Sequence, residues 1–309
     1  MKDISPFVGE YVSFLKQFLR PKKPLKIVFD CSNGSSGPVV RQLITGNKKL
    51  KTKNIIRGII INEQPDGHFP NHSPNPLHAG SLTMLRQRVV KEKADFGIIF
   101  DADGDRMFCV DNKGRFVNPD AVAYLLLWSL RPKKFISDLK AGWLIKQHPF
   151  AAKRIESRTG HYFIKQAMRK YAAELGHEES GHYYFKNFFH CDSGIMAAVE
   201  VLNAVSQLPY ALSDFVDLLP ITVKSWEINV PVRDASAVVG RIEAAYKKDA
   251  IRISKLDGIT MEFKNPDWWF NVRPSNTEPV IRLNMEALDK KVYNAQLKKL
   301  TELLKQASK

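Results

Sequence analysis

The first third of the chain alternates short apolar runs with amphipathic stretches. Residues 25–30 and 54–61 are rich in branched apolar side chains, which is typical of buried strands. Apolar positions three and four apart predict a helix over residues 7–18, and further helices are expected from about Pro38 and over residues 77–92. Because strands alternate with helices, this region is expected to form a mostly parallel sheet covered by helices.

The middle of the chain keeps the alternation but changes its composition. An apolar helix is predicted over residues 119–130, where Pro132 follows as a helix breaker. A strand is expected over residues 135–138 and a helix packed in the core over residues 192–207. These elements indicate a second α/β unit.

The last third begins near Pro220, where the pattern turns to strand, helix and strand. One alternating strand is predicted over residues 221–232, and an amphipathic helix over residues 290–309 ends the chain. We therefore expect an α/β fold with two mixed or parallel α/β domains and a smaller α+β C-terminal domain. The expected domains are residues 1–115, 116–221 and 222–309.

A turn with three acidic residues follows residues 94–100, an apolar run typical of a buried strand. Asp101, Asp103 and Asp105 lie at alternate positions of a loop that contains glycine, so their carboxylates can converge on one hard divalent cation. Mg²⁺ is expected, because it is held by few carboxylates together with phosphate oxygens. Arg106 adds a fixed positive charge beside the cation. An ordinary Asp/Gly turn is the alternative, but it gives no reason for three carboxylates followed by an arginine.

The charge balance favours anionic partners. The 309 residues include 47 Lys and Arg against 32 Asp and Glu, a formal net charge of +15, while 44% hydrophobic content is ordinary for a globular protein. Sugar phosphates, nucleic acid and acidic membranes would all fit such a charge. The basic runs at residues 48–53, 131–134 and 290–309 lack the series of aromatic side chains that stacks bases. A nucleic-acid partner is therefore not expected.

Cysteine usage and hydropathy indicate the compartment. Cys31, Cys109 and Cys191 are scattered, odd in number and without metal-ligand spacing, which favours reduced thiols. The apolar run of residues 121–130 is far shorter than the roughly 20 residues of a membrane span. A soluble cytoplasmic protein without a membrane partner is expected.

Three motifs, in this order, carry a resemblance to a known family: Asp-Ala-Asp-Gly-Asp-Arg at residues 101–106, Gly-His-Glu-Glu-Ser-Gly-His at 176–182 and Arg-Pro-Ser-Asn-Thr-Glu-Pro at 273–279. The chain resembles the α-D-phosphohexomutase superfamily of phosphoglucomutases and phosphomannomutases, whose metal loop is similar to Asp-Gly-Asp-x-Asp-Arg. Ala102 stands where that loop often has glycine. The resemblance covers the last three of the family's four domains.

The resemblance implies sugar-binding roles in the middle of the chain. Glu178 and Ser180 would bind two sugar hydroxyls, and His182 would help to move a hydroxyl proton, unless it makes only a structural hydrogen bond. Gly160 would allow a tight turn, with His161 and Lys165 lining the cleft. A surface lysine is the open alternative for Lys165.

The third motif is expected to bind phosphate. Arginine side chains, two hydroxyls and loop amides suit the acceptor oxygens of a phosphate. The residues expected to bind it are Arg273, Ser275, Asn276, Thr277 and Arg282.

The family's activity would interconvert the 1-phosphate and 6-phosphate of glucose or mannose through a bisphosphate intermediate, with Mg²⁺ and a phosphoserine. That serine lies in a segment similar to Thr-x-Ser-His-Asn-Pro, which this sequence does not contain; Ser32, Ser35 and Ser36 lack the following His-Asn-Pro. Two hypotheses follow. The chain is the larger part of a mutase whose serine domain comes from a separate polypeptide or from ahead of a misassigned start, or it is a catalytically inactive sugar-phosphate-binding remnant.

Overall fold

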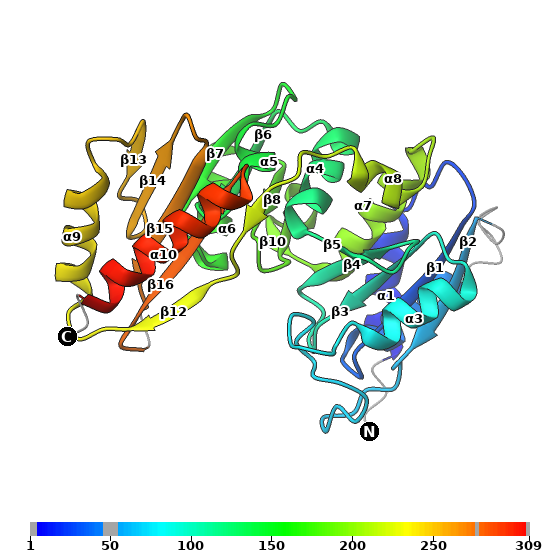
Figure 1. Cartoon of the computed structure of the whole chain (residues 1–309). Coiled ribbons are helices and arrows are strands. Elements are labelled where there is room, and N and C mark those ends of the chain that lie inside the picture. Colours follow the sequence, from blue (N-terminus) through cyan, green and yellow to red (C-terminus); the bar gives the residue numbers. More distant parts are fainter. Residues whose placement is uncertain (1–4, 46–54, 276–277, 307–309) are drawn as a thin grey trace. The chain divides into compact units, whose positions relative to one another are not determined.

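The computed structural model describes residues 5–45, 55–275 and 278–306. Its contacts divide the chain into two compact units. The first comprises residues 1–136, 149–155 and 165–219, and the second residues 137–148, 156–164 and 220–309. The strands form three sheets (Figure 1).

The first sheet has the order β2-β1-β3-β4-β5, in which β1 runs parallel to β2 and β3 while β4 and β5 are antiparallel additions. Helix α3 covers one face, and α1 and α2 the other (Figure 1). Leu85 and Val89 of α3 pack on Val28 and Ile99 of the sheet. The elements are α1 (Ser5–Lys16), β1 (Leu25–Asp30), α2 (Ser36–Thr45), β2 (Ile56–Ile61), α3 (Thr83–Glu92), β3 (Phe96–Phe100), β4 (Met107–Asp111) and β5 (Phe116–Val117).

Helix α3 begins later than the sequence predicts. The expected helix over residues 77–92 starts only at Thr83. Before it, the backbone makes separate turns in which Ser81 N donates to His78 O and Thr83 N to Gly80 O, where Gly80 has φ +89°. This left-handed glycine interrupts the helical path, so the first part of the prediction was wrong.

The second sheet has the order β10-β9-β8-β6-β7. Asn118 caps α4, with Pro119 in its first turn, and the helix ends at Arg131, which has φ +47° just before Pro132. Ser193 caps α7, whose side chains are almost all buried. The elements are α4 (Pro119–Leu130), β6 (Lys134–Asp138), α5 (Trp143–Lys146), β7 (Lys153–Ser157), α6 (His161–Tyr171), β8 (Leu175–His177), β9 (Tyr183–Phe185), η2 (Lys186–Phe188), β10 (Cys191–Asp192), α7 (Gly194–Gln207) and α8 (Leu212–Asp217).

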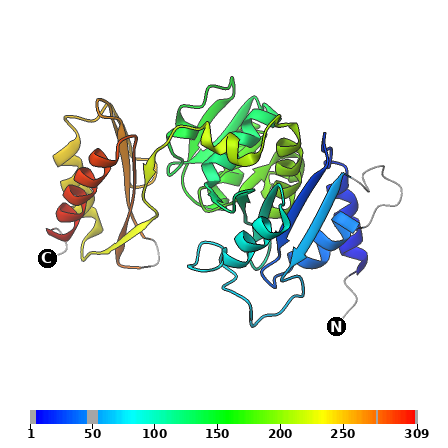
Figure 2. The same cartoon turned by 45° about the vertical axis from the view of Figure 1, so that its right-hand side comes forward.

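The third sheet is antiparallel, with order β11-β16-β15-β14-β13 and β12 also paired to β16. Helices α9 and α10 cover one face of it (Figure 2). Aromatic rings fill the core between them, and Phe263 stacks on Trp268 with ring centroids 4.1 Å apart. The elements are β11 (Val223–Lys224), β12 (Ile228–Pro231), α9 (Ala235–Tyr246), β13 (Arg252–Ser254), β14 (Ile259–Phe263), β15 (Trp268–Pro274), β16 (Val280–Ala287) and α10 (Lys290–Gln306).

The single strand predicted over residues 221–232 is two short strands, β11 and β12. Between them, the hydroxyl of Ser225 accepts a hydrogen bond from Met285 N at 2.9 Å. The hydroxyl takes the place of a backbone carbonyl of the segment between β11 and β12 as acceptor for the β16 amide, so the regular ladder is interrupted here.

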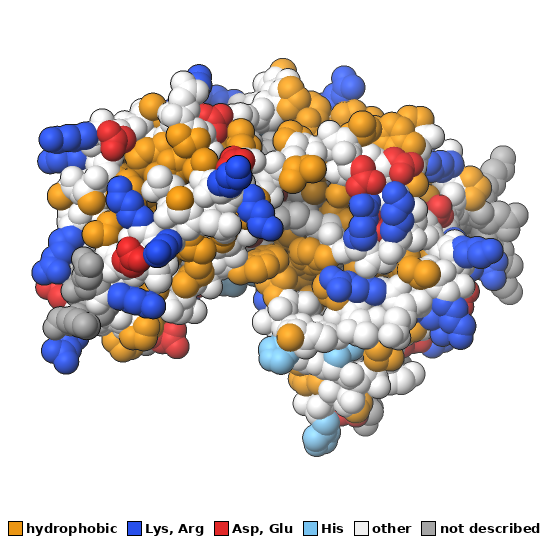
Figure 3. Space-filling view, in the orientation of Figure 1, with side chains coloured by type: hydrophobic (Ala, Val, Ile, Leu, Met, Phe, Trp, Pro, Cys, Tyr) orange, Lys and Arg blue, Asp and Glu red, His pale blue; other side chains and the backbone are white. Residues whose placement is uncertain are grey.

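The predicted fold class is confirmed: two mixed α/β sheets precede a C-terminal antiparallel sheet with its helices. The proposed boundaries of three domains remain a prediction, because the contacts divide the chain into two units. None of the helices within the described ranges combines the length and apolar character that crossing a membrane requires. Lysine and arginine side chains lie in separate groups on the face shown in Figure 3.

Candidate functional site

The acidic loop of residues 101–106 connects β3 to β4, at the carboxyl end of a buried parallel strand. Asp101, Asp103 and Asp105 each offer a carboxylate oxygen, and these atoms lie within 4.8 Å of one another. Asp101 is 2% exposed, Asp105 is partly buried and Asp103 is exposed. The loop after β3 therefore brings together the three carboxylates that the sequence suggested as cation ligands.

Arg106 closes this loop on itself. Its Nε donates to Asp101 Oδ2 at 2.6 Å, and its backbone N donates to Asp101 Oδ1 at 3.1 Å. Burial raises the pKa of the Asp101 carboxyl to about 6, although the hydrogen bonds and charge of Arg106 oppose the shift. The loop is thus a folded unit with an internal ion pair, while Asp103 and Asp105 remain nearer to solvent.

A neighbouring turn supports the backbone of the acidic loop. Ser35 N donates to Ala102 O at 2.8 Å, and the Ser35 hydroxyl donates to Asp103 O at 3.0 Å. A Cβ at Gly34 would lie 2.3 Å from Ala102 O, closer than any side chain allows. The turn after β1 therefore holds the acidic loop through close backbone approach.

The loop of residues 178–182 packs against the acidic loop within the first unit. Met107 N donates to Gly181 O at 3.0 Å, and Arg106 and His182 form an isolated antiparallel bridge. Glu178 is 2% exposed and accepts a hydrogen bond from the hydroxyl of Tyr184. The structure thus brings the expected sugar-binding loop to the expected metal loop.

His182 lies among acidic and hydroxyl groups. Its Nδ1 is 2.8 Å from the Ser180 hydroxyl, and its Nε2 is 3.4 Å from Asp105 Oδ2. Burial by itself lowers the pKa of His182, but the hydrogen bond to Asp105 and the charges of Glu178, Asp105 and Asp192 outweigh it, so the pKa is raised. The same hydrogen bond lowers the pKa of Asp105. This arrangement holds a proton on an imidazole beside the acidic loop.

The start of α7 approaches the acidic loop closely. Gly194 N donates to Gly104 O at 3.0 Å, and a Cβ at Gly194 would lie 2.4 Å from Arg106 O. Just before the helix, Asp192 Oδ1 forms an ion pair with Lys165 Nζ at 2.7 Å. Lys165, for which the sequence left a surface role open, is therefore an ion-pair partner within the first unit.

Gly160 and His161 lie at the start of α6. Gly160 has φ +115°, and its carbonyl accepts from Phe163 N and Ile164 N in the first turn of the helix. Gly160 therefore has the left-handed backbone that the expected tight turn would use. Both residues belong to the second unit, so their roles toward a sugar stay a prediction.

The second unit carries the arginines of the expected phosphate loop. Arg273 of β15 and Arg282 of β16 are direct neighbours in the register of the two strands. Glu227 bridges them: one of its oxygens accepts from Arg273 Nη2 at 2.9 Å, and the other is 3.1 Å from Arg282 Nη1. Arg282 Nη2 also donates to the Ser275 hydroxyl at 3.2 Å. One carboxylate thus neutralises two like charges held side by side.

Both guanidinium groups keep an unused donor. The Nε atoms of Arg273 and Arg282 are buried and have no hydrogen-bond partner within the described ranges. Buried donors without partners are uncommon and expensive, and an anion with several acceptor oxygens would satisfy them. Asn276 and Thr277, also expected to bind phosphate, lie outside the described residues.

Sequence reasoning missed Glu227 and Asp192. Glu227 precedes β12, 46 positions before Arg273, and belongs to none of the three motifs. Asp192 was assigned to the start of a helix, whereas it lies in β10 and binds Lys165. Neither pairing has a local sequence signal, since both partners come from distant parts of the chain.

Comparison with known proteins agrees with this layout. Family models of phosphoglucomutase/phosphomannomutase match three consecutive parts of the chain: alpha/beta/alpha domain II at residues 9–114, alpha/beta/alpha domain III at 118–221 and the C-terminal domain at 227–303.

Curated relatives and a solved structure match over most of the chain. A phosphomannomutase of Salmonella typhimurium is 38% identical over 291 residues, which are 92% of this chain and 63% of the relative. One of Escherichia coli is 37% identical over 286 residues, 90% of this chain and 62% of the relative. A phosphoglucomutase/phosphomannomutase family protein of Burkholderia thailandensis superimposes with a TM-score of 0.83 at 26% identity, over 97% of this chain and 64% of its own.

The chain spans a little under two thirds of the length of these relatives. Its three motifs fall one in each matched domain. The chain therefore belongs to the phosphoglucomutase/phosphomannomutase family and matches domains II, III and IV of that family.

Proposed function

We propose that this chain forms the metal-binding, sugar-binding and phosphate-binding parts of a phosphohexomutase. The reaction would interconvert a hexose 1-phosphate and a hexose 6-phosphate through a hexose bisphosphate. The names of the relatives favour mannose phosphates over glucose phosphates as substrates. The observation that carries the proposal is the convergence of three aspartates, Arg106 and His182 at one strand end.

The donor set of the acidic loop fits Mg²⁺. Three carboxylate oxygens within 4.8 Å of one another form a hard, oxygen-only site. When bound, Mg²⁺ would neutralise charge on the phosphoryl group that is transferred. Asp103 and Asp105 lie nearest to solvent, and Asp101 is positioned by Arg106, so the three carboxylates divide into two accessible ligands and one anchored ligand.

His182 and its neighbours would manage the sugar hydroxyl. The imidazole is held by Ser180 and Asp105, and its raised pKa keeps it protonated to a higher pH than a free histidine. It would exchange a proton with the reacting hydroxyl while Glu178 and Ser180 bind the adjacent hydroxyls. Arg106 would stabilise negative charge on the phosphoryl group.

The phosphate that is not transferred would bind at Arg273 and Arg282. Their unsatisfied Nε donors support this role. The phosphoryl group itself would come from a phosphoserine, which donates it to the hexose phosphate and then takes back the phosphoryl group from the other position of the bisphosphate. We propose that a serine-bearing domain supplies this residue, from the same or a separate polypeptide.

A coupled assay tests this proposal. Conversion of mannose 1-phosphate and glucose 1-phosphate is followed with Mg²⁺ and a trace of hexose bisphosphate, for the chain alone and mixed with a serine-bearing first domain. We expect turnover in the mixture, and its loss in Asp103→Ala. Asp249→Ala removes an exposed carboxylate that is remote in sequence from all three motifs and should leave the rate unchanged.

The same experiment can overturn the enzyme assignment. If the mixture does not turn over either substrate while the chain still binds hexose phosphate, the chain is a sugar-phosphate-binding remnant. If turnover survives in Asp103→Ala, the acidic loop is not the metal site.

A further inference from the structure

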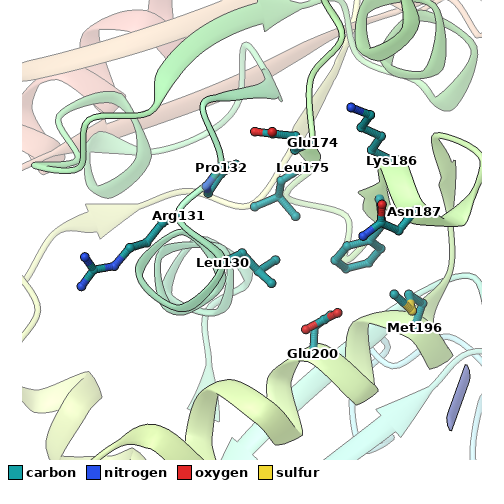
Figure 4. A pocket seen from close by; sticks show the side chains of 10 residues that line it. Leu130, Arg131, Pro132, Glu174, Leu175, Lys186, Asn187, Met196 and Glu200 are labelled. Carbon is teal, nitrogen blue, oxygen red and sulfur yellow. The ribbon is translucent and has the colours of Figure 1, made fainter. Parts of the chain in front are cut away.

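Two adjoining cavities open in the first unit, away from all the residues assigned above. One has a volume of about 270 Å³ and lies between the end of α4, the end of β9 and α7 (Figure 4). The other, of about 340 Å³, lies between the segment after α1 and α7. Both are lined by Leu130, Asn187 and Glu200, so these three residues form a common wall. We call the two cavities together the Glu200 pocket.

Glu200 is an unusual residue for such a wall. It belongs to α7, is 9% exposed, and points into the cavity in Figure 4. Within the described parts of the chain it accepts one hydrogen bond, from Asn203 Nδ2 at 3.1 Å. Burial raises its pKa, against the opposing effect of that hydrogen bond. A carboxylate offers about four acceptor positions, so Glu200 faces the cavity with most of its acceptor capacity unused.

Asn203 cannot donate further hydrogen bonds to Glu200. Its Oδ1 accepts from Arg20 N at 2.7 Å, and its Nδ2 donates to Phe18 O at 2.8 Å as well as to Glu200. The amide therefore fastens the segment after α1 to α7 and is fully engaged. The missing donors for Glu200 must come from the contents of the cavity, either water or a ligand.

Basic side chains outnumber acidic ones on the lining of the pocket, where Glu174 is the second carboxylate beside Glu200 and accepts a hydrogen bond from Lys133 N. Arg131 and Lys186 line the first cavity and Lys22 the second. Among the residues that the structure describes, none of the three forms an ion pair, and Arg131 and Lys186 are exposed. Arg20, also on the lining, directs its guanidinium to Gln17 O. A negatively charged group at the edge would meet cations that are not already neutralised.

We propose that the Glu200 pocket binds a small polyhydroxylated phosphate ester, a phosphorylated polyol, at a position distinct from the acidic loop. Its phosphate would contact Arg131, Lys186 or Lys22, and its hydroxyls would donate to Glu200. An ammonium donor is disfavoured because the four cations of the lining outnumber its two carboxylates, Glu174 and Glu200, and an apolar ligand would leave Glu200 unsatisfied. The cavity volumes suit a molecule of metabolite size. The proposal does not depend on the mutase reaction.

Sorbitol 6-phosphate is the probe, used in isothermal titration calorimetry. The background is the full chain with Arg273→Ala and Arg282→Ala, so that the expected phosphate loop does not compete. We expect one binding site per chain. Glu200→Gln, which keeps the size but removes the charge, should weaken binding by about tenfold or more. Leu130→Trp, which fills the wall common to both cavities, should abolish it.

Matched controls are Glu10→Gln, an exposed carboxylate on α1, and Leu218→Trp, an exposed leucine outside the pocket. Neither should change binding. Thermal melting establishes whether each variant is folded. If Leu130→Trp does not fold, the isosteric variant Glu200→Gln decides the result. Binding that persists in Glu200→Gln, or no saturable binding at millimolar probe, overturns the proposal. The proposal is also overturned if inorganic phosphate binds as tightly as sorbitol 6-phosphate and Glu200→Gln does not change the affinity for inorganic phosphate.

Discussion

The acidic loop and the arginine pair of β15 and β16 both hold like charges close together and offset them with an opposite charge. In the acidic loop, clustered carboxylates are partly neutralised by one arginine, Arg106. In the C-terminal sheet, two arginines are neutralised by one carboxylate, Glu227. In each region one opposite charge pairs with two of the like charges. Longer ion pairs add to it, since His182 lies 3.4 Å from Asp105 and Glu278 lies 3.7 Å from Arg282. A bound cation would neutralise the remaining negative charge of the acidic loop, and a bound anion the remaining positive charge of the two arginines.

Each region also has a glycine that lies very close to the backbone of the charged residues. Gly34 lies so close to the acidic loop that a Cβ would be 2.3 Å from Ala102 O. Gly258, with φ +65°, lies as close to β15, where a Cβ would be 2.3 Å from Val272 O and 2.6 Å from Arg273 Cα. They differ in one respect: only Gly258 of the pair also needs a left-handed backbone. Four substitutions test how far the parallel extends.

The largest effect is expected from Gly34→Ala. The added methyl group must displace the backbone of Ala102, and with it the carboxylates of the acidic loop. A displacement of about 1 Å would lower turnover in the proposed mutase assay with the serine-bearing domain by about 100-fold and weaken Mn²⁺ binding measured by electron paramagnetic resonance. Gly67→Ala, which adds a methyl group to open space, is the control. Unchanged Mn²⁺ binding in Gly34→Ala would show that this turn does not position the loop.

Gly258→Ala should affect the other region, and less strongly. Both the strain of φ +65° and the clash with β15 shift Arg273, so affinity for hexose phosphate should fall about tenfold while Mn²⁺ binding is retained. Calorimetry with hexose phosphate measures the first and resonance spectra the second. Gly240→Ala in α9 has open space and serves as the control. A loss of Mn²⁺ binding would contradict the independence of the two regions.

Glu227→Gln should strengthen phosphate binding by about threefold. The substitution removes the charge that competes with phosphate for Arg273 and Arg282, yet retains an oxygen that can accept one hydrogen bond. Glu278→Gln is the comparison, because Glu278 is largely exposed and lies 3.7 Å from Arg282. Titration with inorganic phosphate distinguishes the two. Weaker binding in Glu227→Gln would mean that the carboxylate orients the arginines more than it competes.

The smallest effect is expected from replacing His72, a titratable residue near the turn that supports the acidic loop. His72, whose side chain is 6% exposed, pairs with Asp30 at 3.2 Å, and its neighbour Asn71 donates to Asn33 beside Gly34. The hydrogen bond to Asp30 raises the pKa of His72 above its usual 6.5. The folded chain then binds more protons than the unfolded chain, so this stabilisation is complete below pH 6.5 and disappears as pH rises through the folded pKa.

His72→Gln should remove that pH dependence. Urea unfolding at pH 6 and pH 8 should give the original chain an advantage of about 1–2 kcal/mol over the variant at pH 6, and less at pH 8. His68→Gln, at a highly exposed position, is the control. An advantage that grows with pH would reverse the inferred sign.

Local patterns were predictable from the sequence. The strand at residues 25–30 and the helix at 119–130 have the predicted bounds, because each is mainly apolar and has strong end signals. A polar, glycine-containing turn follows the first, and Pro119 and Pro132 flank the second. The acidic loop is equally local, since its three aspartates lie within five positions. The convergence of these carboxylates could be predicted from their alternate positions in a loop that contains glycine.

Contacts between distant segments were not predictable. The bridge from Glu227 to two arginines and the pair of Lys165 with Asp192 depend on tertiary packing, which no local pattern encodes. Ser225 interrupted a predicted strand because its hydroxyl competes with backbone acceptors. The roles of Asn276 and Thr277 stay predictions, since these residues lie outside the described ranges.

Helix α7 connects two chemically different places. Its first residue, Gly194, donates to the acidic loop, and Glu200 faces the Glu200 pocket six positions later, about 9 Å along the axis. A rigid helix transmits axial movement between its turns. If occupancy of the pocket shifts α7, cation affinity at the acidic loop changes, and thermodynamic reciprocity then requires the cation to change the pocket's affinity by the same factor.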